Sequence, residues 1–338
     1  MALRIAHLSD IHVGAPLAAR PWLYANKRLT GLLNLHLRRR NAFSRETLDA
    51  TLADCRARRV DHIVVTGDLT NVSLAAEFDA ARDVFARNGW SPDDVTVVPG
   101  NHDVYLASSQ RNRDVERHFA SFMTDCERAV AALTRGGGPG VTKDDCGVFP
   151  FVRMPKGRAV IVGLNSAVPM PPFVARGHIS AGQLAAAERI LADLAAVVAP
   201  TVPRIVLVHH HPLPRLGAKE ASHRLENARE LARLCRRMHV DVVLHGHTHR
   251  PFQGLLGAGA PNTFVVEAGS TTYADQARYN IYDIGATPPT TDEHDALADG
   301  PCAWTTPDGR AVLAHAHVRH HNGNGSFASV PLRAPQEL

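Results

Sequence analysis

Residues that commonly bind metal ions occur in five short groups, each of which directly follows an apolar, strand-like run. The groups are Asp10-Ile11-His12, Gly67-Asp68, Gly100-Asn101-His102-Asp103, His209-His210-His211-Pro212 and Gly246-His247-Thr248-His249. Loops that leave the carboxyl ends of strands in an open α/β sheet converge on one crevice, so the five groups are expected to share one site. Carboxylates, a carboxamide and several imidazoles together suit a pair of divalent cations better than a single ion.

The spacing within the groups predicts how the side chains divide between two cations. Residues i and i+2 of a strand point the same way, so Asp10 and His12 are expected to face one cation. The same spacing lets His247 and His249 reach two neighbouring cations. Asp68 follows a glycine that permits a tight turn, and its two carboxylate oxygens make it the natural bridge. The pattern indicates a dinuclear metal hydrolase.

The composition sets limits on the class of protein. The 338 residues are 45% hydrophobic, which is ordinary for a globular protein, and the net charge is +4 with neutral histidines. The five cysteines are odd in number and form no C-x-x-C pair, so a disulfide framework or structural zinc site is not expected. The N-terminal LRIAHLSDIH lacks the pattern of a signal peptide, and no apolar run reaches the roughly 18 residues that span a bilayer. A cytoplasmic location is expected.

Short apolar runs alternate with segments of 3.6-residue period, which is typical of an α/β protein. Strands are predicted at 3–8, 62–66, 95–98, 149–154, 159–166, 205–208, 242–244, 263–267, 279–284 and 311–319. Helices are predicted at 44–58, 75–87, 113–134, 180–197 and 227–239, with Ser180 as an N-cap. We expect one domain: residues 1–285 form the catalytic unit, and residues 286–338 add a long loop and a C-terminal hairpin to it.

The segment from Pro16 to Arg40 interrupts this alternation and is expected to lie over the site as an insert. Its leucines and its tryptophan alternate loosely with the cationic residues Arg20, Lys27, Arg28, Arg38, Arg39 and Arg40. Two structures fit this pattern. One is a helical cap packed on the rim of the site, and the other is a basic amphipathic helix that touches an anionic membrane surface or substrate.

The ordered pattern D-x-H, G-D, G-N-H-D, H-H-P and G-H-x-H, from residue 10 to residue 249, resembles the calcineurin-like metallophosphoesterase family. Any single block is a weak signal, but all five in order are specific. The flanking runs VVTGDLT, VVPGNHD, and RGHIS followed by QL are similar to its bacterial cyclic-nucleotide-phosphodiesterase-like (class III) branch. The resemblance implies an α/β fold, a four-layer αββα sandwich of two mixed β-sheets flanked by helices.

The resemblance also implies the metals, usually iron, manganese or zinc, and the residues that hold them. The first cation is expected to be bound by Asp10, His12, Asp68 and His249. The second is expected to be bound by Asp68, Asn101, His210 and His247. The family often has two histidines before the proline where this chain has three. Counting back from Pro212 selects His210 and leaves His209 as the alternative; His211 is a candidate for the pocket wall, and His245 is expected in the core.

The expected chemistry follows from two cations beside two carboxylates, Asp10 and Asp68, because the net positive charge attracts a phosphate. Cations about 3.5–4 Å apart share a bridging water and lower its pKa, so that hydroxide attacks phosphorus in line. His102 is not used as a ligand and is predicted to protonate or stabilise the leaving alkoxide. Asp103 is predicted either to orient His102 through a hydrogen bond or to cap its own loop.

The leading interpretation is a phosphodiesterase that acts on small phosphodiesters such as cyclic nucleotides. A phosphomonoesterase, a protein phosphatase and a lipid-linked pyrophosphate hydrolase stay open, because the same metal core serves all of them. A nuclease is disfavoured and no specific nucleic-acid partner is expected, since the charge outside Pro16–Arg40 is scattered. A non-catalytic scaffold is disfavoured because no ligand position is missing. The expected partner is a small phosphoester, and homo-oligomer formation stays open.

Overall fold

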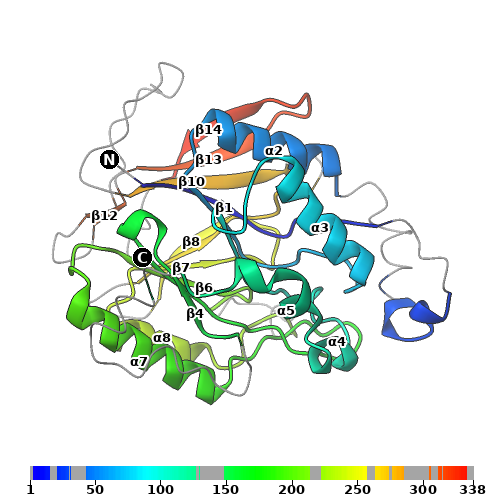
Figure 1. Ribbon diagram of the computed structural model, residues 1–338, viewed down its shortest axis with the longest axis horizontal. Coiled ribbons are helices and arrows are strands. Elements are labelled where there is room, and N and C mark those ends of the chain that lie inside the picture. The colour runs from blue at the N-terminus through cyan, green and yellow to red at the C-terminus, as the bar shows by residue number, and fades with distance from the viewer. Residues whose placement is uncertain are drawn as a thin grey trace.

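Two six-stranded β-sheets lie between two pairs of helices in the computed structural model (Figure 1). Helices α2 (Arg45–Ala57) and α3 (Ala75–Arg87) cover one sheet, and α7 (Ala181–Val197) and α8 (Ala228–Arg237) cover the other. The predicted four-layer α/β sandwich is therefore confirmed. The structure describes residues 3–15, 21–29, 31, 43–126, 129, 148–213, 222–256, 263–273, 276–284, 304–305, 311–313 and 315–332.

The first sheet has the strand order β14-β13-β10-β1-β2-β3. Its strands are β1 (Leu3–Leu8), β2 (His62–Val65), β3 (Val95–Val97), β10 (Arg278–Ile284), β13 (His315–His321) and β14 (Phe327–Pro331). β1, β2 and β3 are parallel, whereas β10, β13 and β14 pair antiparallel. The β10–β13 pairing confirms the predicted hairpin, although β12 (Ala311–Leu313) leaves it to pair with β11 (Trp304–Thr305).

The second sheet has the strand order β4-β5-β6-β7-β9-β8. Its strands are β4 (Phe151–Arg153), β5 (Val160–Gly163), β6 (Arg204–Leu207), β7 (Val242–His245), β8 (Phe252–Leu256) and β9 (Thr263–Glu267). The four central strands are parallel, and the edge strands β4 and β8 are antiparallel. Strand alternation explains how this sheet is buried on both faces. Ile161 and Leu207 face the core between the sheets, while Val162 and Val206 face the core beneath α7 and α8.

Side-chain caps begin two of the long helices where the sequence predicted them. The Ser180 hydroxyl accepts a hydrogen bond from the Gln183 amide at 3.1 Å, and Ser44 accepts one from the Thr47 amide at the same distance. Such caps satisfy amide groups that the first helical turn leaves without partners. Short helices complete the structure: α4 (Ala107–Arg111), α5 (Asp114–Phe119), η1 (Pro21–Tyr24), η2 (Ala120–Phe122) and η3 (Pro155–Gly157).

The helix predicted at 113–134 is confirmed from Asp114 to Phe122, where α5 and η2 lie, and Ala129 is again helical, but the prediction is wrong at residues 123–126. These residues run beside β4 instead. The Cys126 amide donates to the Val152 carbonyl at 3.1 Å, and the Val152 amide donates to the Asp125 carboxylate at 2.7 Å. Pairing with a buried strand overrides the helical periodicity there. The Gly-rich loop after Thr134 lies outside the described residues.

The C-terminal strands pack into the same buried cluster as β1, through Val312, Ala316, Val318 and Leu332. These contacts support the prediction of one domain, which stays a prediction. The predicted long loop at 287–309 is described only at residues 304–305. Among the described residues, no helix is both long enough and apolar enough to cross a bilayer.

Candidate metal centre

The loops after β1, β2 and β3 of one sheet meet the loops after β6 and β7 of the other. They bring together Asp10, His12, Asp68, Asn101, His209, His247 and His249. This is the convergence that the strand-end positions predicted. The side chains form two groups that share one residue.

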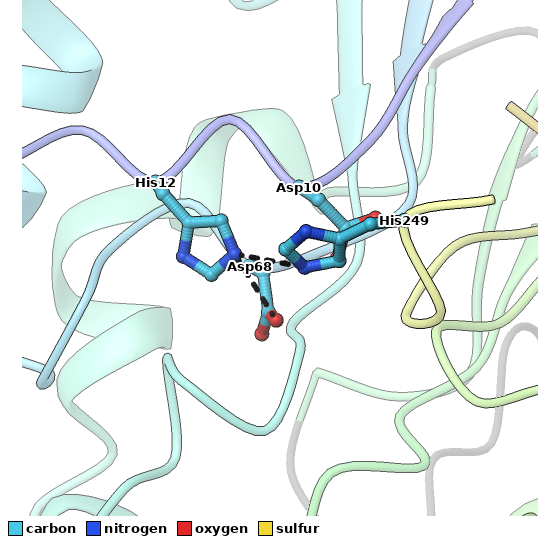
Figure 2. A group of neighbouring side chains, drawn as sticks. All are labelled: Asp10, His12, Asp68 and His249. Atoms are coloured by element: carbon cyan, nitrogen blue, oxygen red, sulfur yellow. Dashed lines mark hydrogen bonds and ion pairs between the residues drawn. The ribbon is translucent and has the colours of Figure 1, made fainter. Parts of the chain in front are cut away.

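The first group consists of Asp10, His12, Asp68 and His249 (Figure 2). His12 Nε2 lies 3.3 Å from His249 Nε2 and 3.7 Å from Asp68 Oδ2. His249 Nε2 lies 3.3 Å from Asp10 Oδ1. The Nδ1–H of His12 donates to the Thr70 carbonyl at 3.1 Å, which leaves the Nε2 lone pair of a neutral ring directed at the group. Four donor atoms thus converge as ligands of one cation would.

The second group consists of Asp68, His209 and His247, with Asn101 beside them. His209 Nε2 lies 3.1 Å from Asn101 Oδ1, 3.1 Å from His247 Nδ1 and 3.5 Å from Asp68 Oδ1. The other ring nitrogen of His209 donates to the Thr66 carbonyl at 2.7 Å. Asp68 therefore directs one oxygen into each group, as expected of a bridging carboxylate.

The structure places His209, the alternative in the sequence analysis, in this group, and not His210. His210 Nδ1 instead pairs with the Ser166 hydroxyl at 2.8 Å, and its Nε2 is buried without a hydrogen-bond partner among the described residues. Burial holds the pKa of His210 well below its ordinary value. Counting forward from the strand would have selected the histidine that lies in the group. His209 stands two positions after the end of β6, as Asp10 does after β1.

The backbone at the centre is strained. Positive φ angles occur at Asp10 (51°), His12 (41°), Asp68 (53°), His247 (86°) and His249 (58°). Non-glycine residues rarely adopt this region, and each instance costs about 1–3 kcal/mol unless the surrounding structure enforces it. The concentration of such residues at one place indicates a functional site.

Two glycines permit the close packing of these loops. A Cβ atom on Gly100 would collide with the Oδ1 and backbone nitrogen of Asp68. A Cβ atom on Gly246 would collide with the Ser9 hydroxyl and lie 2.6 Å from Asp10 Oδ2. The glycines of the G-N-H-D and G-H-x-H blocks are thus required by contact with the carboxylates rather than by their own turns.

The donor atoms fit a pair of cations. Asp10 Oδ2 accepts from the Ser9 hydroxyl at 2.6 Å and the His247 amide at 3.1 Å, whereas Oδ1 is buried without a hydrogen-bond partner in the described part of the chain. Burial opposes the ionisation of Asp10, but His249 and neighbouring imidazoles outweigh it and lower the pKa of the carboxyl. Burial also opposes the charged form of His209, but the neighbouring Asp68 outweighs this effect and raises the pKa of His209. A buried, ionised carboxylate with a vacant lone pair suits a metal ligand.

His102 lies at the edge of the centre and is partly exposed. Its Nδ1 donates to the Asn71 carbonyl at 2.6 Å, and its backbone amide donates to Asp68 Oδ1 at 2.9 Å. The His102 ring stands edge-on to His12, with centroids 4.8 Å apart. The Asn71 carbonyl thus performs the orientation that was predicted for Asp103.

Asp103 is buried and acts on the loop backbone, which was the alternative prediction. Its oxygens accept from the amides of Gly100, Leu69 and Thr70 at 2.9, 3.0 and 2.8 Å, and from the Thr70 hydroxyl at 2.9 Å. Burial and the nearby Asp68 raise the pKa of Asp103 to about 7. These contacts tie the loop after β2 to the loop after β3, so Asp103 is a positioning residue.

The sequence reasoning missed a supporting loop after β9. The hydroxyls of Ser270 and Thr272 donate to the carbonyls of Asp10 and Ile11 at 2.9 and 3.0 Å. The sequence reasoning also did not identify Phe43, whose ring centroid lies 4.2 Å from the ring centroid of His12. The polar run Gly269–Thr272 follows a strand, as the five metal-binding groups do, and this signal could have identified the loop.

Of the predicted insert at 16–40, only residues 21–29 and residue 31 are described. Lys27 Nζ donates to the Met170 carbonyl at 2.8 Å and lies 4.3 Å from the centre of the Tyr105 ring. The Arg28 guanidinium donates to the carbonyls of Val72 and Ser73 at 2.9 and 2.7 Å. These two cations anchor the segment to loops at the rim, as the cap interpretation requires.

Comparison with known proteins agrees with this geometry. The model of the calcineurin-like phosphoesterase family matches residues 3–251. A dimetal phosphatase from Danio rerio has a similar fold, with a TM-score of 0.56 and 12% identity over 83% of this chain and 92% of that one. Purple acid phosphatase PPD1 from yellow lupin (Lupinus luteus) seeds matches with a TM-score of 0.52 and 13% identity. The match covers 99% of this chain and 54% of the lupin protein. No curated protein matches by sequence.

Proposed function

The chain belongs to the calcineurin-like phosphoesterase family, and from that premise we propose that it is a two-metal hydrolase of small phosphodiesters. The single observation that supports a dinuclear centre best is the placement of Asp68. One of its oxygens lies 3.7 Å from His12 and the other lies 3.5 Å from His209, so one carboxylate serves two groups of ligands.

We propose that each group holds one cation, drawn from iron, manganese and zinc. The first would be bound by Asp10, His12, Asp68 and His249. The second would be bound by Asp68, Asn101, His209 and His247, with His209 in the place predicted for His210. Bound cations would supply positive charge for the phosphate and a water of lowered pKa.

The proposed catalytic role of His102 rests on its orientation. Because Nδ1 donates to the Asn71 carbonyl, a protonated ring carries its second proton on Nε2. The proposed role of His102 is to transfer that proton to the leaving oxygen of a phosphoester held between the two groups. Asp103 contributes indirectly, by holding the loops that carry Asp68 and His102.

The preference for diesters rests on the class III branch resemblance and on the aromatic surroundings of the first group. The Phe43 ring lies 5.8 Å from that of His249, and the Tyr273 ring lies 6.0 Å from it. Aromatic side chains there offer apolar contact to the second ester arm of a diester, which a phosphomonoester lacks. The alternatives are a phosphomonoesterase, a protein phosphatase and a lipid-linked pyrophosphate hydrolase.

Hydrolysis of bis(p-nitrophenyl) phosphate by the manganese-reconstituted protein tests the proposal. Activity that exceeds that on p-nitrophenyl phosphate and is lost in Asp68→Ala is the expected result. Activity on the monoester alone would move the protein to the phosphatase alternatives. Two bound metals with no activity on either ester would contradict the proposed preference for small, accessible diesters.

We further propose that the insert at 16–40 makes weak contact with anionic membrane surfaces and that the protein acts in the cytoplasm. The exposed side chain of Trp22, in the same segment as Lys27, supports surface contact. Co-sedimentation with anionic vesicles that fades at high salt is expected. Equal co-sedimentation with neutral vesicles would contradict an electrostatic contact.

A further inference from the structure

A third cluster of metal-binding side chains lies beside the proposed centre. His245 and Glu267 are the last residues of β7 and β9, and His211 lies in the loop after β6; the three strands are adjacent and parallel. His245 and Glu267 are partners in the register of β7 and β9. The sheet therefore places His245 beside Glu267, and the loop after β6 brings His211 to them.

The three side chains are arranged as ligands of one ion would be. Their donor atoms all lie within 4.8 Å of one another. The residues are buried, with exposed fractions of 4% for His211, 0% for His245 and 1% for Glu267. His211 Nδ1 lies 3.2 Å from His245 Nε2, and the ring planes are inclined at 61°.

We propose that His211, His245 and Glu267 bind a third cation, with zinc as the best fit. Two imidazoles and one carboxylate form a donor set that zinc favours, with room for one further oxygen ligand. A divalent cation would also offset the cost of burying the Glu267 charge.

Neighbouring groups already hold two of the three ligands in place. His245 Nδ1 donates to the Gly246 carbonyl at 3.0 Å, so a neutral His245 ring presents the Nε2 lone pair on the side of His211. Glu267 Oε1 accepts from the Thr248 amide at 2.8 Å and from the Thr248 hydroxyl at 2.5 Å. Outer hydrogen bonds of this kind orient metal ligands in proteins.

The third cation would have a structural role. His211 stands two residues after His209, His245 stands two residues before His247, and Thr248 lies between His247 and His249. An ion in the cluster would tie the loops that carry these proposed catalytic ligands to one another. The site does not depend on the reaction that the protein performs.

Metal content tests the site directly. Protein stripped by a chelator, reloaded with zinc and desalted is expected to retain about three ions per chain, measured by mass spectrometry of the metal. His211→Gln should lose one equivalent, whereas His62→Gln, which alters a buried histidine bonded to Thr96, should lose none. Asp68→Ala should lose the ions of the catalytic groups and keep the third. Two ions in the wild type, unchanged in His211→Gln, would overturn the proposal.

An anomalous difference map at the zinc edge avoids any dependence on the folding of variants. A crystal of the zinc-loaded wild type should show a peak about 2.0–2.2 Å from donor atoms of all three residues. Peaks at the catalytic groups with none at this cluster would show that His211 and His245 are joined by a hydrogen bond alone.

Discussion

His209 Nε2 lies 3.1 Å from Oδ1 of Asn101, although the two residues are 108 positions apart and belong to loops of different sheets. The contact depends on Thr66, whose carbonyl accepts from His209 Nδ1 at 2.7 Å and fixes the ring. The neighbouring His210 turns away toward Ser166. This contrast decides which imidazole completes the second group.

His209→Ala is therefore expected to weaken binding of the second metal by more than about 100-fold, since even the loss of an outer partner costs about 10–100-fold. His210→Ala is the matched control and should retain both catalytic metals. Calorimetric titration of the apo variants with manganese measures the difference. Equal losses in the two variants would argue against the assignment of His209.

His102→Ala should lower kcat by about 10²–10⁴-fold, the range for loss of a general acid, while metal content stays unchanged. The reason is that the bond from His102 Nδ1 to the Asn71 carbonyl places the second proton of a protonated ring on Nε2, from which the proposed transfer occurs. Steady-state kinetics with parallel metal analysis checks this. A kcat within a few-fold of the wild type would exclude His102 from proton transfer.

Asp103→Ala should act mainly on stability. It removes the acceptor of three buried amides and one hydroxyl, so we expect a loss of about 3 kcal/mol or more in the free energy of unfolding. Urea denaturation of the apo protein measures this loss, with His102→Ala as the control that changes it little. A small effect of Asp103→Ala would mean that water replaces the carboxylate.

Gly100→Ala should reduce activity by about 100-fold, because its Cβ collides with Asp68 and displaces the bridging carboxylate. Gly14→Ala is a matched control in a neighbouring loop, where the new Cβ meets only the Asn71 side chain at 3.6 Å. The ratio of the two kcat/KM values is the measurement. Comparable activities would show that the loop after β3 shifts to accommodate the new Cβ atom and leaves Asp68 in place.

His62 predicts a pH dependence of stability far from the metal ligands. Burial lowers its pKa from 6.5 to about 3, so the native state holds it neutral while the unfolded state takes up a proton below pH 6.5. Its stabilising contribution is complete above pH 6.5 and is lost as the pH falls toward 3. The free energy of unfolding therefore changes with pH by at most about 1.4 kcal/mol per pH unit through this one group.

His62→Gln should flatten this acid limb, measured by urea denaturation of the chelator-treated protein between pH 4 and pH 7. His62 bonds to the Thr96 hydroxyl at 2.7 Å, and a glutamine amide preserves that polarity. If the free energy of unfolding depends on pH in the same way in the variant and the wild type, His62 is not the source of the acid dependence.

The sequence by itself predicted most of the strands, the long helices and the positions of the functional loops, but not the edge strands β8 and β14. Continuous apolar runs such as those of β5 and β6, which are buried along nearly their whole length, and metal-binding residues at strand ends are local properties that the chain displays directly. For the same reason Asp10, His12, Asp68 and Asn101 could be named from their spacing.

Only the tertiary structure decided which of two adjacent histidines faces the centre and which group orients His102. Adjacent residues in a turn point in different directions, and their directions depend on positive φ angles and on partners from the other sheet, such as Asn101 for His209. The predicted helix is interrupted after Phe122 for the same reason, because residues 125–126 form hydrogen bonds with β4. Long-range contacts of this kind leave no periodic signal in the sequence, so they appear only when the two sheets pack together.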